Sequence, residues 1–201
     1  MTGSAWRWLV DGALWACWGL FGLVWAAGAI YNHKHSPAVR TRAKTRELLV
    51  IVAVGLFLLA RVVPLQDWRP LSVGDHRLQL LGLPLLLGAT AFTLWARAAL
   101  GTMWSSAPLA REHHQLRTEG PYGITRHPIY TGILGMLIGT ALLSGLGYWA
   151  VVVAVVIAGL ELKIHYEEQL MAESFPHDYP AYRRRVPQLI PGLGRLRRQA
   201  A

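Results

Sequence analysis

The stretch that decides the fold runs from residue 129 to residue 162 and reads IYTGILGMLIGTALL-SGLG-YWAVVVAVVIAGLEL. Two apolar runs, 129–143 and 148–162, flank the short segment SGLG at 144–147. Glycines favour tight turns because they adopt backbone conformations that other residues avoid. We therefore predict a hairpin of two membrane-spanning helices.

Three further apolar runs precede the hairpin, from about Ala13 to Tyr31, Leu48 to Leu65 and Leu78 to Ala99. The hydrocarbon core of a bilayer needs about 20 mostly apolar residues per helix. Charged residues make up 15% of the 201 residues, against roughly 25% in an ordinary soluble domain. We predict an all-α, polytopic membrane protein with about five transmembrane helices, of which three lie in residues 1–100.

The Lys and Arg residues are distributed unevenly between the two sides that five spans define. Segments 32–46 and 101–128 and the chain from residue 163 onward carry fifteen of them, whereas the opposite side carries only three, Arg7, Arg69 and Arg77. Membrane proteins keep Lys and Arg mainly in cytoplasmic loops. We therefore predict that the N-terminus lies outside and the C-terminus in the cytoplasm. Arg97 lies near a span end, from which a long basic side chain reaches the interface.

Composition also limits the partners. A net charge of +9 suits nucleic acid or an anionic membrane surface. Because the basic residues lie between apolar runs and no nucleic-acid module is recognisable, we expect membrane lipids as partners and no nucleic acid. Cys17 lies in the first apolar run and is expected to be a small apolar residue of the core or the lipid face. His113 and His114 are adjacent without zinc-type spacing, so no metal site is predicted.

The segment Arg126-His127-Pro128 lies directly before the first helix of the hairpin. Proline restricts the residue before it and suits the first turn of a helix. Pro128 is therefore predicted to start the helix, with Arg126 and His127 held at its N-terminal end. The free N–H groups of a helix start favour a nearby carboxylate. The alternative is an interfacial anchor, with the Arg on lipid phosphate and the His solvated.

A second polar segment, KIHYEE at 163–168, stands at the far end of the hairpin. Because a hairpin brings its two ends together, residues near Arg126 and residues near Glu168 are expected to be close in space. A carboxylate in this place suits a ribose hydroxyl or an amino group as hydrogen-bond donor. The alternative is that Glu167 and Glu168 are an ordinary solvated charge pair.

In this order, the two segments resemble the isoprenylcysteine carboxyl methyltransferase family, whose C-terminal core is similar to that of the phospholipid N-methyltransferases. Gly120-Pro121-Tyr122 and then RHPIYTG at 126–132 are similar to the family's G-x-Y followed by R-H-P-x-Y-x-G. Paired acidic residues, a Phe, a Tyr-x-x-Tyr and an Arg-Val-Pro run that ends in Ile-Pro follow, up to about residue 192. The resemblance implies that residues 101–201 form a methyltransferase core with a cofactor pocket on its cytoplasmic side.

Carried over position by position, the resemblance also implies site residues. Those implied to bind S-adenosylmethionine are His114, Gln115, Leu116, Arg117, Tyr122, His127, Pro128, Ile129, Tyr130 and Glu168. Arg126 and Lys163 match basic positions near the methyl acceptor. The family's usual residue at the latter position is Arg, and Lys supplies a point charge instead of a planar fork. Phe175-Pro176 stands where the family usually has Phe-Gly.

The implied reaction is an in-line methyl transfer from the sulfonium to a nucleophile on a lipidic or isoprenoid-like acceptor. The protein positions donor and acceptor about 3 to 3.5 Å apart, and no metal is needed because the cofactor carries the activated group. A carboxylate acceptor is already ionised at neutral pH. An amine or thiol needs a base, for which Glu167 and His165 are candidates. Arg126, Lys163 and Glu167 are therefore the candidate catalytic residues.

Three alternatives stay open at this point. The first is a phospholipid or small-molecule N- or S-methyltransferase, which shares the cofactor site and differs in the acceptor. The second is a membrane reductase of the sterol type with a nicotinamide cofactor. The third is a non-catalytic membrane scaffold that keeps the fold, and the intact Arg-His-Pro and Glu-Glu segments argue against it. The sequence leaves the oligomeric state open.

Overall fold

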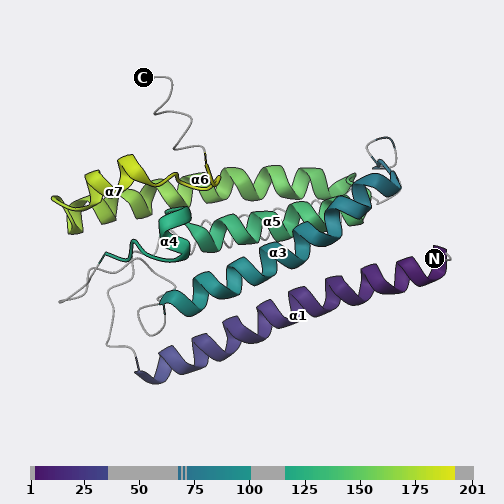
Figure 1. Cartoon of the computed structure of the whole chain (residues 1–201), viewed down its shortest axis with the longest axis horizontal. Coiled ribbons are helices and arrows are strands. Elements are labelled where there is room, and N and C mark those ends of the chain that lie inside the picture. Colours follow the sequence, from purple (N-terminus) through teal and green to yellow (C-terminus); the bar gives the residue numbers. More distant parts are fainter. Residues whose placement is uncertain (1–2, 36–67, 69, 71, 101–115, 193–201) are drawn as a thin grey trace.

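The computed structural model describes residues 3–35, 68, 70, 72–100 and 116–192, in which the regular structure is helical. The helices are α1 (Gly3–His35), α3 (His76–Leu100), α4 (Pro121–Ile124), α5 (Pro128–Leu143), α6 (Tyr148–Ser174) and α7 (Tyr179–Arg185) (Figure 1). Within these residues the only β pairing is an isolated bridge between Ser72 and Leu146. The all-α prediction is therefore confirmed. The span predicted from Leu48 to Leu65 lies outside the described residues.

Three of the described helices are long and apolar enough to cross a membrane: Ser4–Tyr31, His76–Leu100 and Tyr148–Ser174. The apolar helix α5 is shorter and joins α6 through the predicted turn, in which Gly145, Leu146 and Gly147 have φ angles of 84°, 60° and 51°. Positive φ is cheap for glycine and uncommon for other residues. The helical hairpin is confirmed, while its first helix is shorter than the helices that are long enough to cross a membrane. The chain has several apolar helices, as a multi-pass membrane protein does.

One boundary differs from the sequence prediction. The last span was expected to end near Leu162, but α6 continues to Ser174. Residues 163–174 contain neither Gly nor Pro, and nothing else in them interrupts the hydrogen bonds of a helix. Glu167 and Glu168 therefore lie on the helix itself instead of following it, and the helix fixes their direction.

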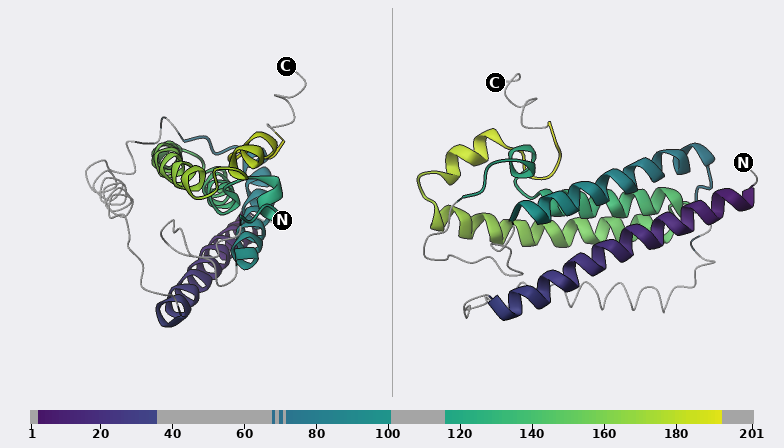
Figure 2. Two further views of the ribbon diagram at one scale, coloured as in Figure 1. Left: turned by 90° about the vertical axis from the view of Figure 1, so that its left-hand side faces the viewer. Right: turned by 60° about the horizontal axis from the view of Figure 1, so that its bottom comes forward.

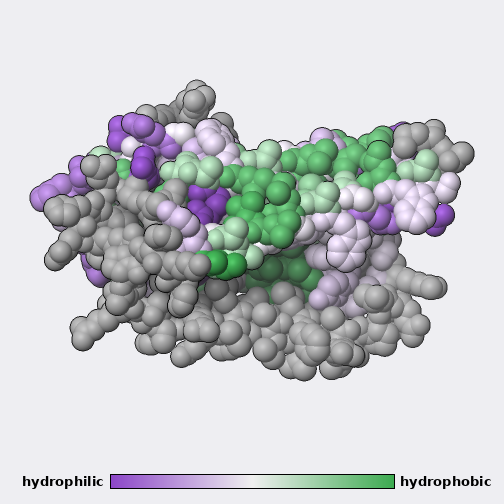
Figure 3. Space-filling model, turned by 90° about the horizontal axis from the view of Figure 1, so that it is seen from below, coloured by the Kyte–Doolittle hydropathy of each residue, from purple (hydrophilic) through white to green (hydrophobic). Residues whose placement is uncertain are grey.

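The helices α3, α5 and α6 lie side by side, with α5 antiparallel to both, while α1 crosses α3 (Figures 1 and 2). The final turns of α1, α3 and α6 and the start of α5 lie at the same end of the bundle as α4 and α7 (Figure 1). On the face shown in Figure 3, apolar side chains gather in the middle of the described part, and hydrophilic side chains lie toward both ends. This pattern fits a membrane around the middle. Which compartment faces the α4–α7 end stays a prediction.

The core lies between α1, α3 and α5. Cys17 is buried in a cluster with Val10, Leu86, Met136 and other apolar residues, as its position in the sequence suggested. The Trp18 indole donates a hydrogen bond to Thr140 Oγ1 at 3.1 Å and so ties α1 to α5. Buried indole N–H groups need such a partner.

Glycines bring α5 unusually close to α3. A Cβ added at Gly135 would lie 2.7 Å from the Cβ of Ala89, and one added at Gly139 would lie 2.8 Å from the backbone nitrogen of Leu86. Small residues at membrane helix interfaces allow this approach and gain van der Waals contact between backbones. The close contact fixes α5, and therefore the residues at its start, against α3.

We expect Gly139→Ala to lower the thermal unfolding temperature in detergent. The added methyl meets backbone atoms that cannot move alone, and overpacking of this kind costs roughly 1 to 3 kcal/mol. Gly88→Ala is the matched control, because Gly88 is on α3 with nothing within 4 Å of its added Cβ. Equal unfolding temperatures for the two variants would contradict the close α3–α5 contact.

Candidate functional site

The start of α5 presents two of the predicted site residues. Pro128 occupies the first turn of α5 and His127 is its N-cap residue, as the sequence predicted. The backbone N–H groups of Arg126 and His127 do not point to solvent. They donate to the carbonyl oxygens of Pro187 and Gln188 at 2.8 and 3.1 Å. The segment before the helix is thus held by a part of the chain about 60 residues away.

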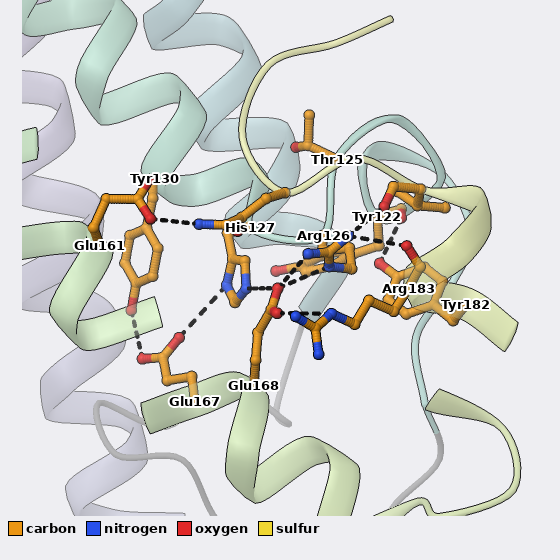
Figure 4. Close-up of polar contacts among 12 residues, drawn as sticks. Tyr122, Thr125, Arg126, His127, Tyr130, Glu161, Glu167, Glu168, Tyr182 and Arg183 are labelled. Atoms are coloured by element: carbon orange, nitrogen blue, oxygen red, sulfur yellow. Dashed lines mark hydrogen bonds and ion pairs between the residues drawn. The ribbon is translucent and has the colours of Figure 1, made fainter. Parts of the chain in front are cut away.

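The two adjacent carboxylates of α6 face this segment (Figure 4). Oε1 of Glu168 accepts hydrogen bonds from Arg126 Nε at 2.8 Å and Arg126 Nη2 at 2.5 Å. Oε1 of Glu167 accepts from the Tyr130 hydroxyl at 2.7 Å and forms an ion pair with Lys163 Nζ at 2.9 Å. Lys163 lies one helical turn before Glu167, a spacing that places both on one face of α6. Each carboxylate therefore has its own cation.

His127 lies between the two carboxylates. Its Nδ1 is 3.6 Å from Glu167 Oε2, and its Nε2 is 3.4 Å from Glu168 Oε1. The imidazole ring is parallel to the Tyr130 ring, with centroids 5.7 Å apart. Burial by itself lowers the pKa of His127, but the interactions with Glu167 and Glu168 outweigh it, and the net shift of the pKa is upward. The two carboxylates therefore favour the protonated imidazole.

The segment after α7 closes the cluster on another side. Arg126 Nη1 donates to the carbonyl oxygens of Arg183 and Val186 at 3.2 and 2.6 Å. The Arg183 guanidinium also approaches Glu168, with Nε 3.4 Å from Oε2. The Tyr182 hydroxyl donates to the backbone oxygen of Tyr122 at 2.7 Å. Burial raises the pKa of the Tyr182 hydroxyl, so this group stays protonated and remains a donor.

The cluster combines charge with burial. The side chains of Arg126, Lys163 and Glu168 are each 8% exposed, and that of Glu167 is 16% exposed. Only Arg183, at 62%, is largely exposed. Buried charges that are paired and hydrogen-bonded in this way have fixed directions, and each charged side chain strongly restricts the position of its partner. The cluster is thus a rigid polar site at one end of apolar helices.

The structure brings together six of the residues that the sequence analysis named, from parts of the chain up to 42 positions apart. They are Arg126, His127, Tyr130, Lys163, Glu167 and Glu168. Pro128 is buried, Ile129 is half-buried beside it, and Tyr122 connects to the cluster through Tyr182. Leu116 is half-buried and Arg117 exposed in the segment before α4. His114 and Gln115 lie outside the described residues.

No site role was predicted from the sequence for Arg183, Tyr182 or the backbone of residues 186–188. All three groups contact the predicted site. The Tyr-x-x-Tyr and Arg-Val-Pro motifs pointed to this part of the sequence, but a motif does not show which residues its side chains and backbone contact. The described residues contain no group of His, Cys, Asp and Glu that could hold a metal ion.

A family model described as phospholipid methyltransferase matches residues 78–178. The chain is 40% identical over 81 residues to protein-S-isoprenylcysteine O-methyltransferase B of Arabidopsis thaliana, an alignment that covers 40% of this chain and 41% of that protein. It is 31% identical over 102 residues to the cobalt-zinc-cadmium resistance protein CzcN of Cupriavidus metallidurans, covering 50% of this chain and 47% of the relative.

The chain thus matches less than half the length of these curated relatives. Among solved structures, a eukaryotic isoprenylcysteine carboxyl methyltransferase, described as an intramembrane Ras methyltransferase, aligns with a TM-score of 0.63. The alignment has 19% sequence identity and covers 92% of this chain and 67% of that one. At this identity the likeness concerns the fold.

Proposed function

Because the chain belongs to the phospholipid methyltransferase family, we propose that it is an integral membrane methyltransferase that uses S-adenosylmethionine and acts on a lipidic acceptor. Of the known enzymes, isoprenylcysteine carboxyl O-methyltransferase is the one it is proposed to be most like. The observation that carries the proposal is the buried cluster around His127, with its two carboxylates and two buried cations. It lies where apolar helices end, which suits an acceptor that partitions into the membrane.

The remaining polar atoms of the cluster fit the cofactor. Within the described part of the chain, Glu167 and Glu168 each make their short contacts through Oε1, whereas their Oε2 atoms make longer contacts, at 3.6 Å to His127 and 3.4 Å to Arg183. Such oxygens can accept hydrogen bonds from ribose hydroxyls or an ammonium group. Among the described residues, Nε2 of His127 is buried without a hydrogen-bond partner. Glu168 Oε1 lies 3.4 Å from this nitrogen as an ion-pair partner, and an acceptor on a ligand would supply the hydrogen bond that is missing among the described residues.

From these positions we assign one proposed group of residues to the cofactor and another to the acceptor. When bound, S-adenosylmethionine supplies a methyl group activated by a positively charged sulfur. His127, Tyr130 and Glu168 are proposed to hold the cofactor, together with Tyr122, Pro128 and Ile129 around them and the preceding His114, Gln115, Leu116 and Arg117. Lys163 and Glu167, which are buried and paired, are proposed to face the acceptor. Their task is to orient the acceptor and to keep water away from it.

A carboxylate acceptor fits this site better than an amine. Oε1 of Glu167 already accepts from Tyr130 and is paired with Lys163, and a carboxylate stabilised in this way is a weak base. An amine needs a base to take its proton, whereas a carboxylate does not. With His127 protonated, the cluster of Arg126, Lys163 and the two carboxylates carries one net positive charge, which favours an anionic acceptor. Phospholipid or small-molecule N- and S-methylation remains the alternative, because the family name includes phospholipid substrates.

The test is calorimetric titration of the detergent-purified protein with S-adenosylmethionine. We expect saturable binding by the wild type, loss of binding in His127→Ala, and unchanged binding in His165→Ala. His165 is the matched control, since it is exposed on α6 and contacts Gln169. Transfer of a radiolabelled methyl group to prenylated carboxylates, phosphatidylethanolamine and hydrophobic thiols then identifies the acceptor. A folded wild type that binds no S-adenosylmethionine would reject the proposal in favour of a reductase or a scaffold.

A further inference from the structure

The guanidinium group of Arg126 is almost fully used by acceptors of the protein itself. An arginine side chain has five N–H donors. The Nε donor and one Nη2 donor go to Glu168 Oε1, and Nη1 donates to the carbonyl oxygens of Arg183 and Val186. The side chain is 8% exposed. A residue that grips a ligand directly needs donors that are free to reach it, and Arg126 has at most one.

The partners of Arg126 belong to two parts of the chain that are distant from it in sequence. Glu168 is on α6, Arg183 is on α7, and Val186 begins the segment after α7. Arg126 itself directly precedes α5. Figure 4 shows Arg126 between Glu168 and Arg183. Its fork therefore joins α5, α6 and the tail, which we define as residues 179–192.

Backbone and side-chain hydrogen bonds hold the same tail at neighbouring points. The carbonyl oxygens of Pro187 and Gln188 accept from the N–H groups of Arg126 and His127. One turn into α5, the Thr131 hydroxyl donates to the carbonyl oxygen of Leu189 at 2.7 Å. Residues 186–189 therefore run along the start of α5, next to His127. The tail is a wall of the candidate site, and Arg126 is at the centre of its attachment.

We propose that Arg126 is a positioning residue, which locks the tail against α5 and α6 and aims Glu168, and that it does not grip the methyl acceptor. The inference rests on the proposed function for its effect on cofactor binding. The other part of the proposal, that Arg126 holds the tail against α5 and α6, does not depend on a cofactor. Arg126 then acts on the reaction only through Glu168 and through the closed position of residues 183–189.

The shape of the arginine side chain explains why a positive charge alone cannot replace Arg126. The fork donates to a carboxylate on one edge and to two backbone carbonyls through Nη1. A lysine ammonium at this position is a point charge on a flexible stem. It can pair with Glu168, but it cannot also bind the carbonyl oxygens of Arg183 and Val186 in the same geometry. The Arg126→Lys variant therefore keeps a positive charge beside Glu168 but loses the hydrogen bonds to the carbonyl oxygens of the tail.

The experiment compares full-length wild type, Arg126→Lys and Arg184→Lys in detergent. Arg184 is exposed on α7 and keeps a trypsin site when changed to Lys, so it is the matched control. The first measurement is the rate of trypsin cleavage at residues 183–185, followed by mass spectrometry. Cleavage of a segment that opens transiently follows the population of its open form. The second measurement is the Kd for S-adenosylmethionine, and the third is KM for the acceptor.

For Arg126→Lys we expect cleavage to be roughly tenfold faster and S-adenosylmethionine binding to be roughly tenfold weaker, because two hydrogen bonds to the tail are lost. Arg184→Lys should match the wild type in both. Wild-type cleavage and wild-type cofactor affinity in Arg126→Lys, with only a higher KM for the acceptor, would overturn the proposal and return Arg126 to the acceptor. If the wild type binds no S-adenosylmethionine, the proposed function fails, and the cleavage rates still decide whether Arg126 locks the tail.

Discussion

Replacing Glu168 with Ala is expected to abolish S-adenosylmethionine binding and to lower the unfolding temperature by roughly 10 to 15 °C. The carboxylate is the acceptor for two donors of Arg126 and lies within 3.4 Å of both His127 and Arg183. Its removal leaves the buried guanidinium without its anion and the imidazole with Glu167 as its one carboxylate neighbour among the described residues. Breaking one partner of a buried ion pair costs about 3 to 5 kcal/mol. The cofactor also loses Oε2 of Glu168, which in the structure has the longer contact to Arg183.

Glu173→Ala is the matched control for this prediction. Glu173 is exposed on the same helix, so its removal should leave unfolding and binding unchanged. The double variant Arg126→Met/Glu168→Leu separates stability from binding, since apolar replacement of a whole buried pair is often neutral or stabilising. We expect the double variant to regain unfolding temperature without regaining affinity. Strong S-adenosylmethionine binding by a folded Glu168→Ala protein would remove this carboxylate from the cofactor site.

The sequence was sufficient for the parts of the fold that depend on local pattern. Apolar runs and the SGLG turn predicted the hairpin, and Pro128 predicted the start of its first helix. The hairpin in turn predicted that Arg126 and Glu168 meet, and they form an ion pair. Proximity followed from topology alone, because the two ends of a hairpin must lie together whatever their side chains are.

Other features depended on geometry that no pattern contains. The tail contacts are made largely by carbonyl oxygens, which every residue carries, so the sequence could not reveal that Val186 and Pro187 bind Arg126. The close approach of α5 to α3 likewise depends on which face Gly139 occupies. The end of α6 was misjudged because hydropathy marks the end of a membrane span, not the end of a helix. Residues 163–174 are polar and still helical.

Lys163→Met is expected to produce a defect whose size depends on pH. Lys163 is buried and pairs with Glu167 Oε1 at 2.9 Å. Without the ammonium, Glu167 keeps the Tyr130 hydroxyl and the His127 ring, whose Nδ1 is 3.6 Å from Oε2. At alkaline pH the imidazole is neutral and the carboxylate has no cation beside it. We expect a loss of about 3 kcal/mol there, or an unfolding temperature lower by about 10 °C.

The sign of the pH dependence follows from His127. Its pKa in the folded protein is raised by Glu167 and Glu168 despite burial. A group with a raised pKa contributes stability fully below its unfolded value, about 6.5, and that contribution is lost as the pH rises through the folded pKa. Removing the Lys163 charge takes away a repulsive neighbour, so the imidazole of the variant should keep its proton to a higher pH. Protonated His127 then replaces the missing cation.

The difference in unfolding temperature between wild type and Lys163→Met should therefore be small at pH 6 and should grow toward pH 9. Scanning calorimetry across this range measures it. The same pair of proteins in a His127→Gln background is the control, because glutamine carries no titrating proton, and the difference there should be large at every pH. A difference that varies with pH in the His127→Gln background as well would mean that another group replaces the charge. If the difference in unfolding temperature does not change with pH in either background, protonated His127 does not replace Lys163 as the cation beside Glu167.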